Sequence, residues 1–395
     1  MTMSPTIARS GQGVARPGVL AGLFAQRRLR LLPMIIVLLV IWAALQGLTD
    51  GLFLSARNLT NLSGQVAITA ILAAGAVMVM VPGYIDLSLG ATVAASAVVA
   101  AMMSNTFALN FWPTVIITLG FGLAVGLWHA FWVAWMRVPS FIVTLASLLA
   151  IRGVSLVITG AETISPSQDM LLISDASLGP TTSIVLLALV WLAFSALQVR
   201  EWRAQQAAGI PSSFAATVGL PAGGFGAVAL AAVFVAVGYR GIPLPVALVM
   251  AIIAITGMIL RYTAFGRHLY AIGGNHQAAQ LAGINIRAHA SLVFAGMGLL
   301  YAVAGLVLVA RLDSAPPTAA EGLELNVIAA AVIGGTSLLG GRGTVVGAAI
   351  GALLMESLAN GMSLMNLPSS YQSITVGLVL LLAVYADLRG RGGAE

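Results

Sequence analysis

Long apolar runs recur along this chain, and they constrain its fold more than any other feature. An α-helix needs about 20 apolar residues to cross the hydrocarbon layer of a bilayer. Runs that approach or reach this length cover residues 31–48, 62–81, 87–104, 112–135, 139–159, 181–199, 214–237, 243–260, 289–310, 324–339, 343–360 and 371–386. Charged residues make up only 8% of the chain, whereas a soluble domain carries about 25%. The sequence therefore predicts an all-α, polytopic membrane helix bundle of about 10–12 transmembrane helices.

The runs at 324–339 and 343–360 are short and rich in glycine. Small residues let helix backbones approach closely in lipid, which explains most of these glycines. The two pieces also fit a broken or re-entrant pair, because non-helical backbone is tolerated at membrane depth where protein surrounds it. We therefore expect at least one interrupted helix in the bundle.

The arginines predict how the chain crosses the membrane. All 18 basic residues are arginine. With twelve spans and a cytoplasmic N-terminus, 14 arginines fall in inner segments, Arg152 falls within a span, and three are outside: Arg57, Arg240 and Arg311. This bias agrees with the rule that inner loops carry the positive charge. Both termini are therefore expected in the cytoplasm.

The same reading gives a simple domain organisation. Residues 1–30 hold five arginines among glycine, proline and serine, and we expect them to form a disordered cytoplasmic tail. Residues 31–388 form a single transmembrane domain, since no composition change divides them. Residues 389–395 are expected to be a second cytoplasmic tail.

Missing residue types exclude several kinds of chemistry. The chain has no cysteine, which excludes disulfides and thiolate-bound metals. It has no lysine, so it contains no phosphate-binding P-loop and cannot be its own P-loop ATPase. The histidines lack helical pairing, and no serine lies in a nucleophile motif, so we expect no metal site, cofactor or catalytic residue. The arginines have a topological explanation, and no nucleic-acid partner is expected.

The segment PGYIDLSLG, residues 82–90, interrupts a span with proline and glycine. Such a break frees backbone groups that neighbouring helices or water must satisfy. Asp86 and Ser88 stand at the start of the next helical run and are candidates to cap it. Alternatively, Asp86 faces water in a discontinuous helix that lines a translocation path. The two interpretations are compatible, and both stay open.

Arg152 lies within or near the outer end of its span, so its charge needs a partner or an exit to water. Glu162 is the candidate partner because it lies near the same end. A structural ion pair is favoured over a contact with substrate, although both assign Arg152 to the outer half of the bundle.

Glu356 and Asn360 are one helical turn apart and therefore share a face of their helix. A carboxyl group within an apolar run can couple transport to protons, or it can bond a neighbouring helix. The second role is favoured because no other acid lies at helical spacing in the span. Glu324 and Asn326 enter the preceding span and are further candidates for lining a path.

Residues 261–289 form the one long polar interruption of the chain. Gly273 and Gly274 break a helix, Asn275 suits an N-cap, HQAAQLA favours helix, and Gly283 suits a C-terminal stop. A helix of about two turns is too short to be stable alone, so it must dock into something. A groove on a cytosolic protein fits better than the membrane surface, because the segment lacks a marked apolar face with arginines.

Several segments together resemble the permease subunits of bacterial ABC importers for pentoses and related monosaccharides. They are SARNLTNL (55–62), IDLSLG (85–90), VPSFIVTLA (138–146), RGV (152–154), TAFGRHLYAIGGN (263–275), LAGINI (281–286), VIGGTSLLGG (332–341) and NGMSLM (360–365). The similarity spans residues 30–390. The chain length and the extra spans around 181–237 favour the xylose-like branch over the shorter ribose-like one.

The resemblance implies partners and roles. Such permeases form homodimers, receive a monosaccharide from a periplasmic sugar-binding protein, and bind a cytosolic tandem ATPase subunit. It also implies that residues 273–283 form the helix that couples to the ATPase, through Gly273, Gly274, Asn275, His276, Ala278, Ala279, Gln280 and Gly283. The IDLSLG segment would line or gate the path. Tyr84 departs from the family pattern of a small or acidic residue at this position, and it is expected to narrow the path or to stack on sugar.

The sequence thus favours a non-enzymatic permease subunit of an ATP-driven sugar importer, with a pentose such as D-xylose as substrate. The candidate path or gate residues are Tyr84, Asp86, Ser88, Arg152, Asn326, Glu356 and Asn360. The first alternative is an ion-coupled secondary transporter that uses Asp86, Arg152 or Glu356, although no convincing pair of sites in two related halves supports it. A lipid-embedded enzyme or a channel is a further alternative without positive evidence.

Overall fold

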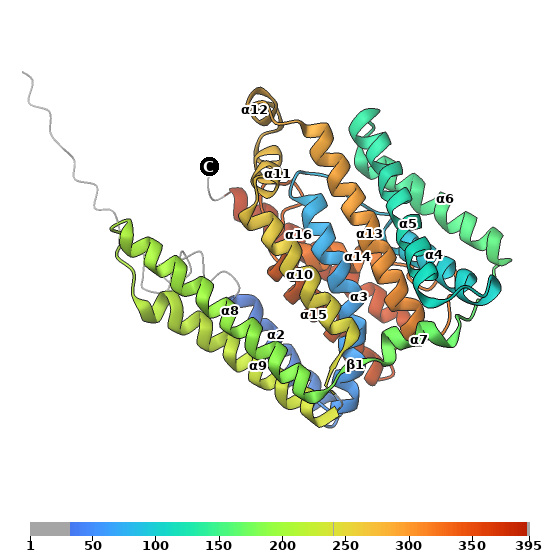
Figure 1. Cartoon of the computed structure of the whole chain (residues 1–395), viewed down its shortest axis with the longest axis horizontal. Coiled ribbons are helices and arrows are strands. Elements are labelled where there is room, and N and C mark those ends of the chain that lie inside the picture. Colours follow the sequence, from blue (N-terminus) through green and yellow to red (C-terminus); the bar gives the residue numbers. More distant parts are fainter. Residues whose placement is uncertain (1–31, 240, 393–395) are drawn as a thin grey trace, which may run out of the picture.

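The computed structural model describes residues 32–239 and 241–392. The predicted tail at 1–30 and Arg240 lie outside these residues. Helices make up almost all of the described chain, as predicted (Figure 1). The exception is a pair of two-residue strands, β1 (Ser177–Leu178) and β2 (Ile242–Pro243), which pair antiparallel.

A helix lies in each of the twelve predicted runs. These helices are α2 (Leu32–Leu48), α3 (Ala56–Met80), α4 (Leu89–Ala101), α5 (Phe111–Ala130), α6 (Ser140–Thr159), α8 (Pro180–Ala207), α9 (Leu220–Tyr239), α10 (Leu244–Tyr262), α13 (Ile286–Leu312), α14 (Leu323–Ile333), α15 (Val345–Leu364) and α16 (Ser369–Gly392). Within the described residues, eight of them are long and apolar enough to cross a bilayer, while α2, α14 and α16 have shorter apolar stretches.

Three short helices complete the described chain: α7 (Gln168–Asp175), α11 (Ala264–Gly274) and α12 (His276–Leu281). Single π-helical turns extend α4 and α5 and precede α9. Helix α16 continues through Gly392, past the predicted end of the membrane domain at residue 388.

Two interruptions divide the bundle. The first separates α3 from α4 at residues 81–88. The second follows α14, whose 11 residues span only about 16 Å of a layer roughly 30 Å thick. Residues 334–344 then run without helix to α15. The predicted interrupted helix is therefore present, and α15 itself is of full length.

Helices α3 and α13 form the centre of the bundle. Nearly every residue of α3 from Ala67 onward is buried, and α13 packs against α3, α4 and α5. Small residues make the α5–α13 crossing possible. A β-carbon on Gly126 would lie only 3.0 Å from the α-carbon of Gly298. Such close backbone approach is how helices associate in lipid. The glycines predicted to allow it between α14 and α15 do so, since a β-carbon on Gly351 would collide with the carbonyl oxygen of Ala330.

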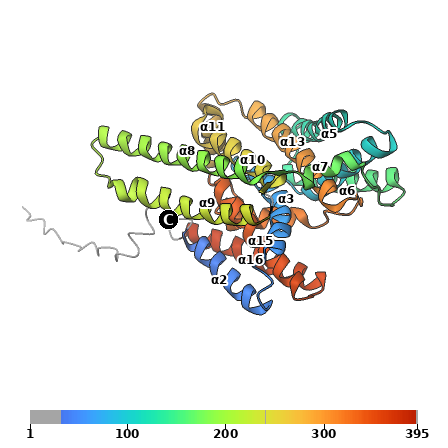
Figure 2. The same cartoon turned by 60° about the horizontal axis from the view of Figure 1, so that its bottom comes forward.

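Helices α8 and α9 form a hairpin at the edge of the bundle (Figures 1 and 2). Trp191 on α8 fastens the hairpin by donating its indole N–H to the carbonyl of Ala222, 2.9 Å away. On α8, only Ser183 and Leu187 are buried within the described residues. This pair of helices therefore forms an outer layer beside the buried centre of the bundle.

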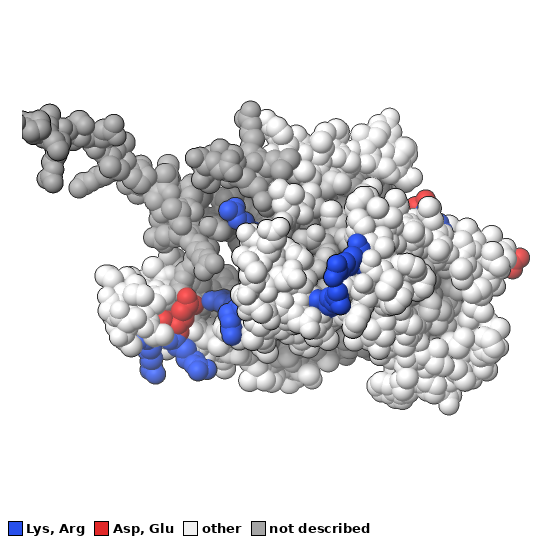
Figure 3. Space-filling model, turned by 90° about the horizontal axis from the view of Figure 1, so that it is seen from above, with Lys and Arg blue, Asp and Glu red and all other residues white. Residues whose placement is uncertain are grey.

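The end of the bundle that carries α11 and α12 is rich in arginine. Basic side chains are spread over this face, with few acidic ones among them (Figure 3). Exposed arginines from the surrounding loops and helix ends are Arg137, Arg261, Arg267, Arg287 and Arg342. All five belong to the segments that the charge pattern predicts on one side of the membrane.

Candidate functional site

The interruption between α3 and α4 is held by hydroxyl groups of α6. Once the helix stops, the N–H of Ile85 donates to the hydroxyl oxygen of Ser140 at 3.0 Å, and that of Leu87 donates to Thr144 at 3.0 Å. Ser140 and Thr144 are one turn apart and therefore share a face of α6. The predicted satisfaction of freed backbone groups by a neighbouring helix is confirmed. These two residues were not predicted, although their spacing within VPSFIVTLA could have indicated them.

Asp86 organises the rest of this interruption. Its side chain is only 4% exposed. One oxygen, Oδ1, accepts the N–H of Ser88 at 2.9 Å and its hydroxyl at 2.8 Å, while Oδ2 accepts the hydroxyl of Tyr301. Asp86 thus orders the turn that leads into α4. In turns, Asp and Asn side chains commonly bond the backbone of the residue two positions further along the chain.

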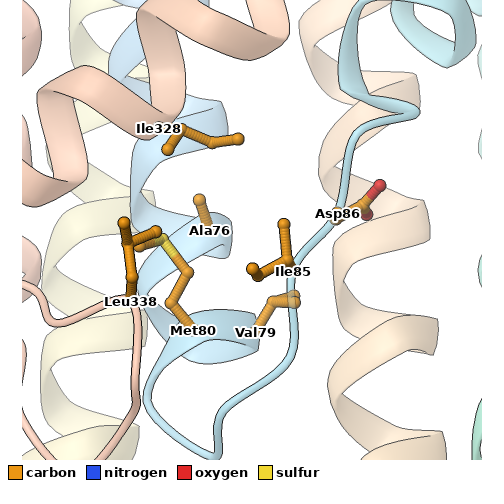
Figure 4. A pocket seen from close by; sticks show the side chains of 7 residues that line it. All are labelled: Ala76, Val79, Met80, Ile85, Asp86, Ile328 and Leu338. Carbon is orange, nitrogen blue, oxygen red and sulfur yellow. The ribbon is translucent and has the colours of Figure 1, made fainter. Parts of the chain in front are cut away.

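The predicted capping of α4 by the side chain of Asp86 or Ser88 is wrong. Helix α4 begins at Leu89, and the Ser88 side chain makes no cap bond to its first turn. Asp86 bonds the residue before the helix instead. Tyr301 was missed because it is 215 residues from Asp86 in the sequence. Figure 4 shows the Asp86 carboxylate turned away from the six apolar side chains that line a small cavity beside it.

Tyr84 is one of the residues that line a large cavity. Its ring is tilted against that of Phe294, with the centroids 5.7 Å apart. The cavity has a volume of about 870 Å³ and extends from Tyr84 to His276 and Gln280 on α12. Arg137 and Arg287 are among its other lining residues. The interruption and the predicted docking helix therefore face one hollow at the arginine-rich end.

Arg152 forms an ion pair with Glu321, not with Glu162. The guanidinium nitrogen Nη1 lies 3.2 Å from Oε1 of Glu321, and the side chains are 23% and 65% exposed. Glu321 follows α13 in the chain, and the fold brings it beside α6. The choice of Glu162 was wrong because it relied on nearness in sequence. The pair is the structural contact that the sequence favoured for Arg152.

Glu356 and Asn360 fasten α15 to α3. The hydroxyl of Thr69 donates to Oε1 of Glu356 at 2.5 Å, and the amide of Asn58 donates to Oδ1 of Asn360 at 2.8 Å. Both bonds lie on one face of α15, as the spacing predicted. They support the interpretation of Glu356 as a bonding partner of a neighbouring helix.

The two polar residues of α14 are placed differently from each other. Glu324 is buried, whereas Asn326 is half-buried. A β-carbon on Gly90 would collide with the Glu324 carboxylate, so α4 packs directly on this side chain. The structure brings neither residue into the cavity beside Tyr84.

The predicted docking helix is present as α12. The side chain of Asn275 accepts the N–H of Ala278 at 2.9 Å, which is the expected N-cap. Gly283 follows the helix with φ +82°, a conformation that favours glycine. Gly273 and Gly274 end α11 and are therefore not part of α12.

Helix α12 presents most of its surface to the surroundings. Ala279 is buried, while His276, Ala278 and Gln280 are exposed. Leu281, the last residue of α12, is 90% exposed. The sequence pattern does not single it out.

Two histidines meet between α11 and α13. Nδ1 of His268 lies 3.0 Å from Nε2 of His289, whose ring stacks on Phe265. Sequence reasoning missed this contact because the residues are 21 positions apart. Within the described residues, no three side chains of metal-binding type gather to hold an ion.

Comparisons with known proteins show which family the chain is similar to. The family described as "Branched-chain amino acid transport system / permease component" matches residues 58–384. The xylose transport system permease protein XylH of Escherichia coli K12 is 44% identical over 91% of this chain and 92% of its own length. XylH of Haemophilus influenzae is 42% identical over 90% and 95%, and the ribose import permease protein RbsC of Escherichia coli K12 is 34% identical over 89% and 92%. No solved structure matches the chain.

Proposed function

Because the chain belongs to the family of transport-system permease components, we propose that it is the membrane-spanning subunit of an ATP-driven importer for D-xylose or a similar pentose. The names of its relatives support the sugar, since the two nearest in identity among those above are xylose permeases and the third is a ribose permease. Energy comes from a separate ATPase subunit, because a chain without lysine has no P-loop.

Helix α12 carries this proposal. It is a capped helix of six residues at the arginine-rich end of the bundle, with Leu281 90% exposed. So short a helix is not stable alone and is ordered by its surroundings. Burial of the exposed Leu281 side chain against a partner would stabilise the complex. We therefore assign α12 to the groove of a cytosolic ATPase. With α12 in the cytoplasm, the arginine pattern puts both termini on the same, cytoplasmic side of a bacterial inner membrane.

The remaining parts of the importer follow from this orientation. A periplasmic sugar-binding protein delivers the pentose to the opposite face, and two copies of the chain enclose the path. Within each copy, Tyr84 and the interruption around Asp86 control the inner end of that path. This assignment is supported by the cavity of about 870 Å³ that Tyr84 shares with His276 and Gln280. Arg152, Glu356 and Asn360 serve as structural contacts.

The test is to compare Leu281→Asp with Leu312→Asp, which changes an exposed leucine at the far end of α13. Each variant is extracted with its ATPase partner, and the recovered ATPase is measured. Burial of a leucine side chain contributes about 1.5–3 kcal/mol. Leu281→Asp should therefore weaken ATPase binding about tenfold or more, and Leu312→Asp should leave it unchanged. Equal recovery with both variants would remove α12 from the docking surface.

A further inference from the structure

Three segments of the chain meet at one point at the arginine-rich end of the bundle. Val81 ends α3, Gly273 lies in the last turn of α11, and Gly341 belongs to the loop between α14 and α15. The N–H of Gly341 donates to the carbonyl oxygen of Val81 at 2.8 Å. A β-carbon on Gly341 would lie 3.2 Å from the carbonyl oxygen of Gly273. We call these three residues the glycine junction.

Gly273 is the most tightly enclosed member of the glycine junction. A β-carbon at this position would overlap the carbonyl oxygen of Val81 and would lie 2.5 Å from the nitrogen of Gly341. The requirement is for space, because the φ angle of Gly273 is not positive. At the next residue, Gly274, a β-carbon would meet nothing within 4 Å. Of these two glycines, only Gly273 therefore brings the backbone of α11 into direct contact with the end of α3.

A second contact holds α11 on the same loop. The hydroxyl of Tyr270, one turn before Gly273, donates to the carbonyl oxygen of Gly343 at 2.7 Å. Both contacts lie between α12 and the α3–α4 interruption. Only Gly274 and Asn275 separate Gly273 from α12, and Asn275 is fixed as its N-cap. Five positions after Val81 the chain reaches Asp86.

Close-packed backbones transmit displacement because they have no slack to absorb it. We propose that Gly273 is the positioning residue that carries movement of α12 to the α3–α4 interruption, through its direct backbone contact with Val81. This inference rests on the proposed role of α12 as the helix that docks on the ATPase. A shift of α12 moves the last turn of α11 against Val81, and residues 82–88 move with it. The ATPase thus acts on the turn that Asp86 organises.

The experiment uses the full importer, reconstituted with its ATPase and sugar-binding protein. Gly273→Ala is compared with Gly274→Ala, which stiffens the same helical turn without entering the glycine junction. The measured quantities are xylose uptake, ATP hydrolysis, their ratio, and the amount of bound ATPase. For Gly273→Ala we expect normal ATPase binding with an ATP-to-sugar ratio raised about tenfold. For Gly274→Ala the ratio should stay within about twofold of wild type.

If Gly273→Ala fails to accumulate in the membrane, Tyr270→Phe takes its place, since it removes the hydroxyl that bonds to Gly343 and keeps the ring. It should raise the ratio about threefold with ATPase binding intact. The inference is overturned if the variant that accumulates has a wild-type ATP-to-sugar ratio. It is also overturned if that variant loses ATPase binding, because the effect would then be confined to α12. If Leu281→Asp uncouples the importer while Gly273→Ala transports normally, only this inference fails. If Leu281→Asp also leaves coupling intact, the proposed function of α12 fails.

Discussion

Tyr301 offers the sharpest test of the interruption between α3 and α4. Its ring is fully buried on α13, and its hydroxyl donates to Oδ2 of Asp86. Replacement of Tyr301 by phenylalanine removes this donor and keeps the shape of the ring. The Asp86 carboxylate would keep only the two bonds from Ser88. The substitution therefore removes the Tyr301 hydroxyl from a buried carboxylate and leaves the packing of the ring in place.

The size of the effect follows from the burial of this pair. A hydrogen bond to a charged group contributes about 1.5–3 kcal/mol, and a buried acceptor left without its donor costs a similar amount. We therefore expect Tyr301→Phe to lower the free energy of unfolding by about 2 kcal/mol. For a chain of this size, that is a decrease of roughly 2–4 °C in melting temperature. Uptake should also fall, because Asp86 orders the turn that leads into α4.

The assay is thermal unfolding of the purified protein in a mild detergent, together with xylose uptake by the reconstituted importer. Tyr262→Phe is the matched control, since Tyr262 is 56% exposed on α10. It should change the free energy of unfolding by less than about 0.5 kcal/mol. The reasoning would be refuted if Tyr301→Phe melted and transported like Tyr262→Phe. The Asp86 carboxylate would then not depend on Tyr301 for its position.

Two further contacts separate structural from functional roles. Glu356→Gln keeps an oxygen that accepts from Thr69, so uptake should stay within about twofold of wild type; loss of uptake with unchanged melting would instead indicate ion coupling. Arg152→Ala should change the free energy of unfolding by less than about 1 kcal/mol, because Glu321 is 65% exposed to solvent. Its KM for xylose should also be unchanged. A large increase in KM would instead indicate that Arg152 contacts the substrate.

Much of the architecture could be predicted from local patterns. Apolar runs located the twelve helices because lipid requires each span to satisfy its own backbone bonds. The cap at Asn275 and the stop at Gly283 were also predictable, since both depend on residues within one or two turns. The two interruptions were predicted from their glycines and proline.

Contacts between distant segments could not be predicted in the same way. Tyr301 and Asp86, Arg152 and Glu321, and Asn58 and Asn360 are all brought together by helix packing. A single sequence carries no record of which helices become neighbours. Glu162 was a wrong choice for this reason.

The glycine junction shows the same limit more clearly. The sequence marks Gly273 and Gly274 equally, as a break between two helices. Only the fold distinguishes them. A β-carbon on Gly273 would collide with the backbone of Val81 and Gly341, whereas nothing lies within 4 Å of a β-carbon on Gly274. Spatial crowding at one glycine is a property of three segments together.

Uptake of labelled xylose into proteoliposomes tests the central claim most directly. The purified chain is reconstituted with its ATPase and sugar-binding protein, with or without ATP on the ATPase side, and a protonophore is added. We predict uptake that requires both ATP and the ATPase subunit and that persists with the protonophore. Uptake by the chain alone that follows a proton gradient and stops with the protonophore would contradict the account and identify a secondary transporter.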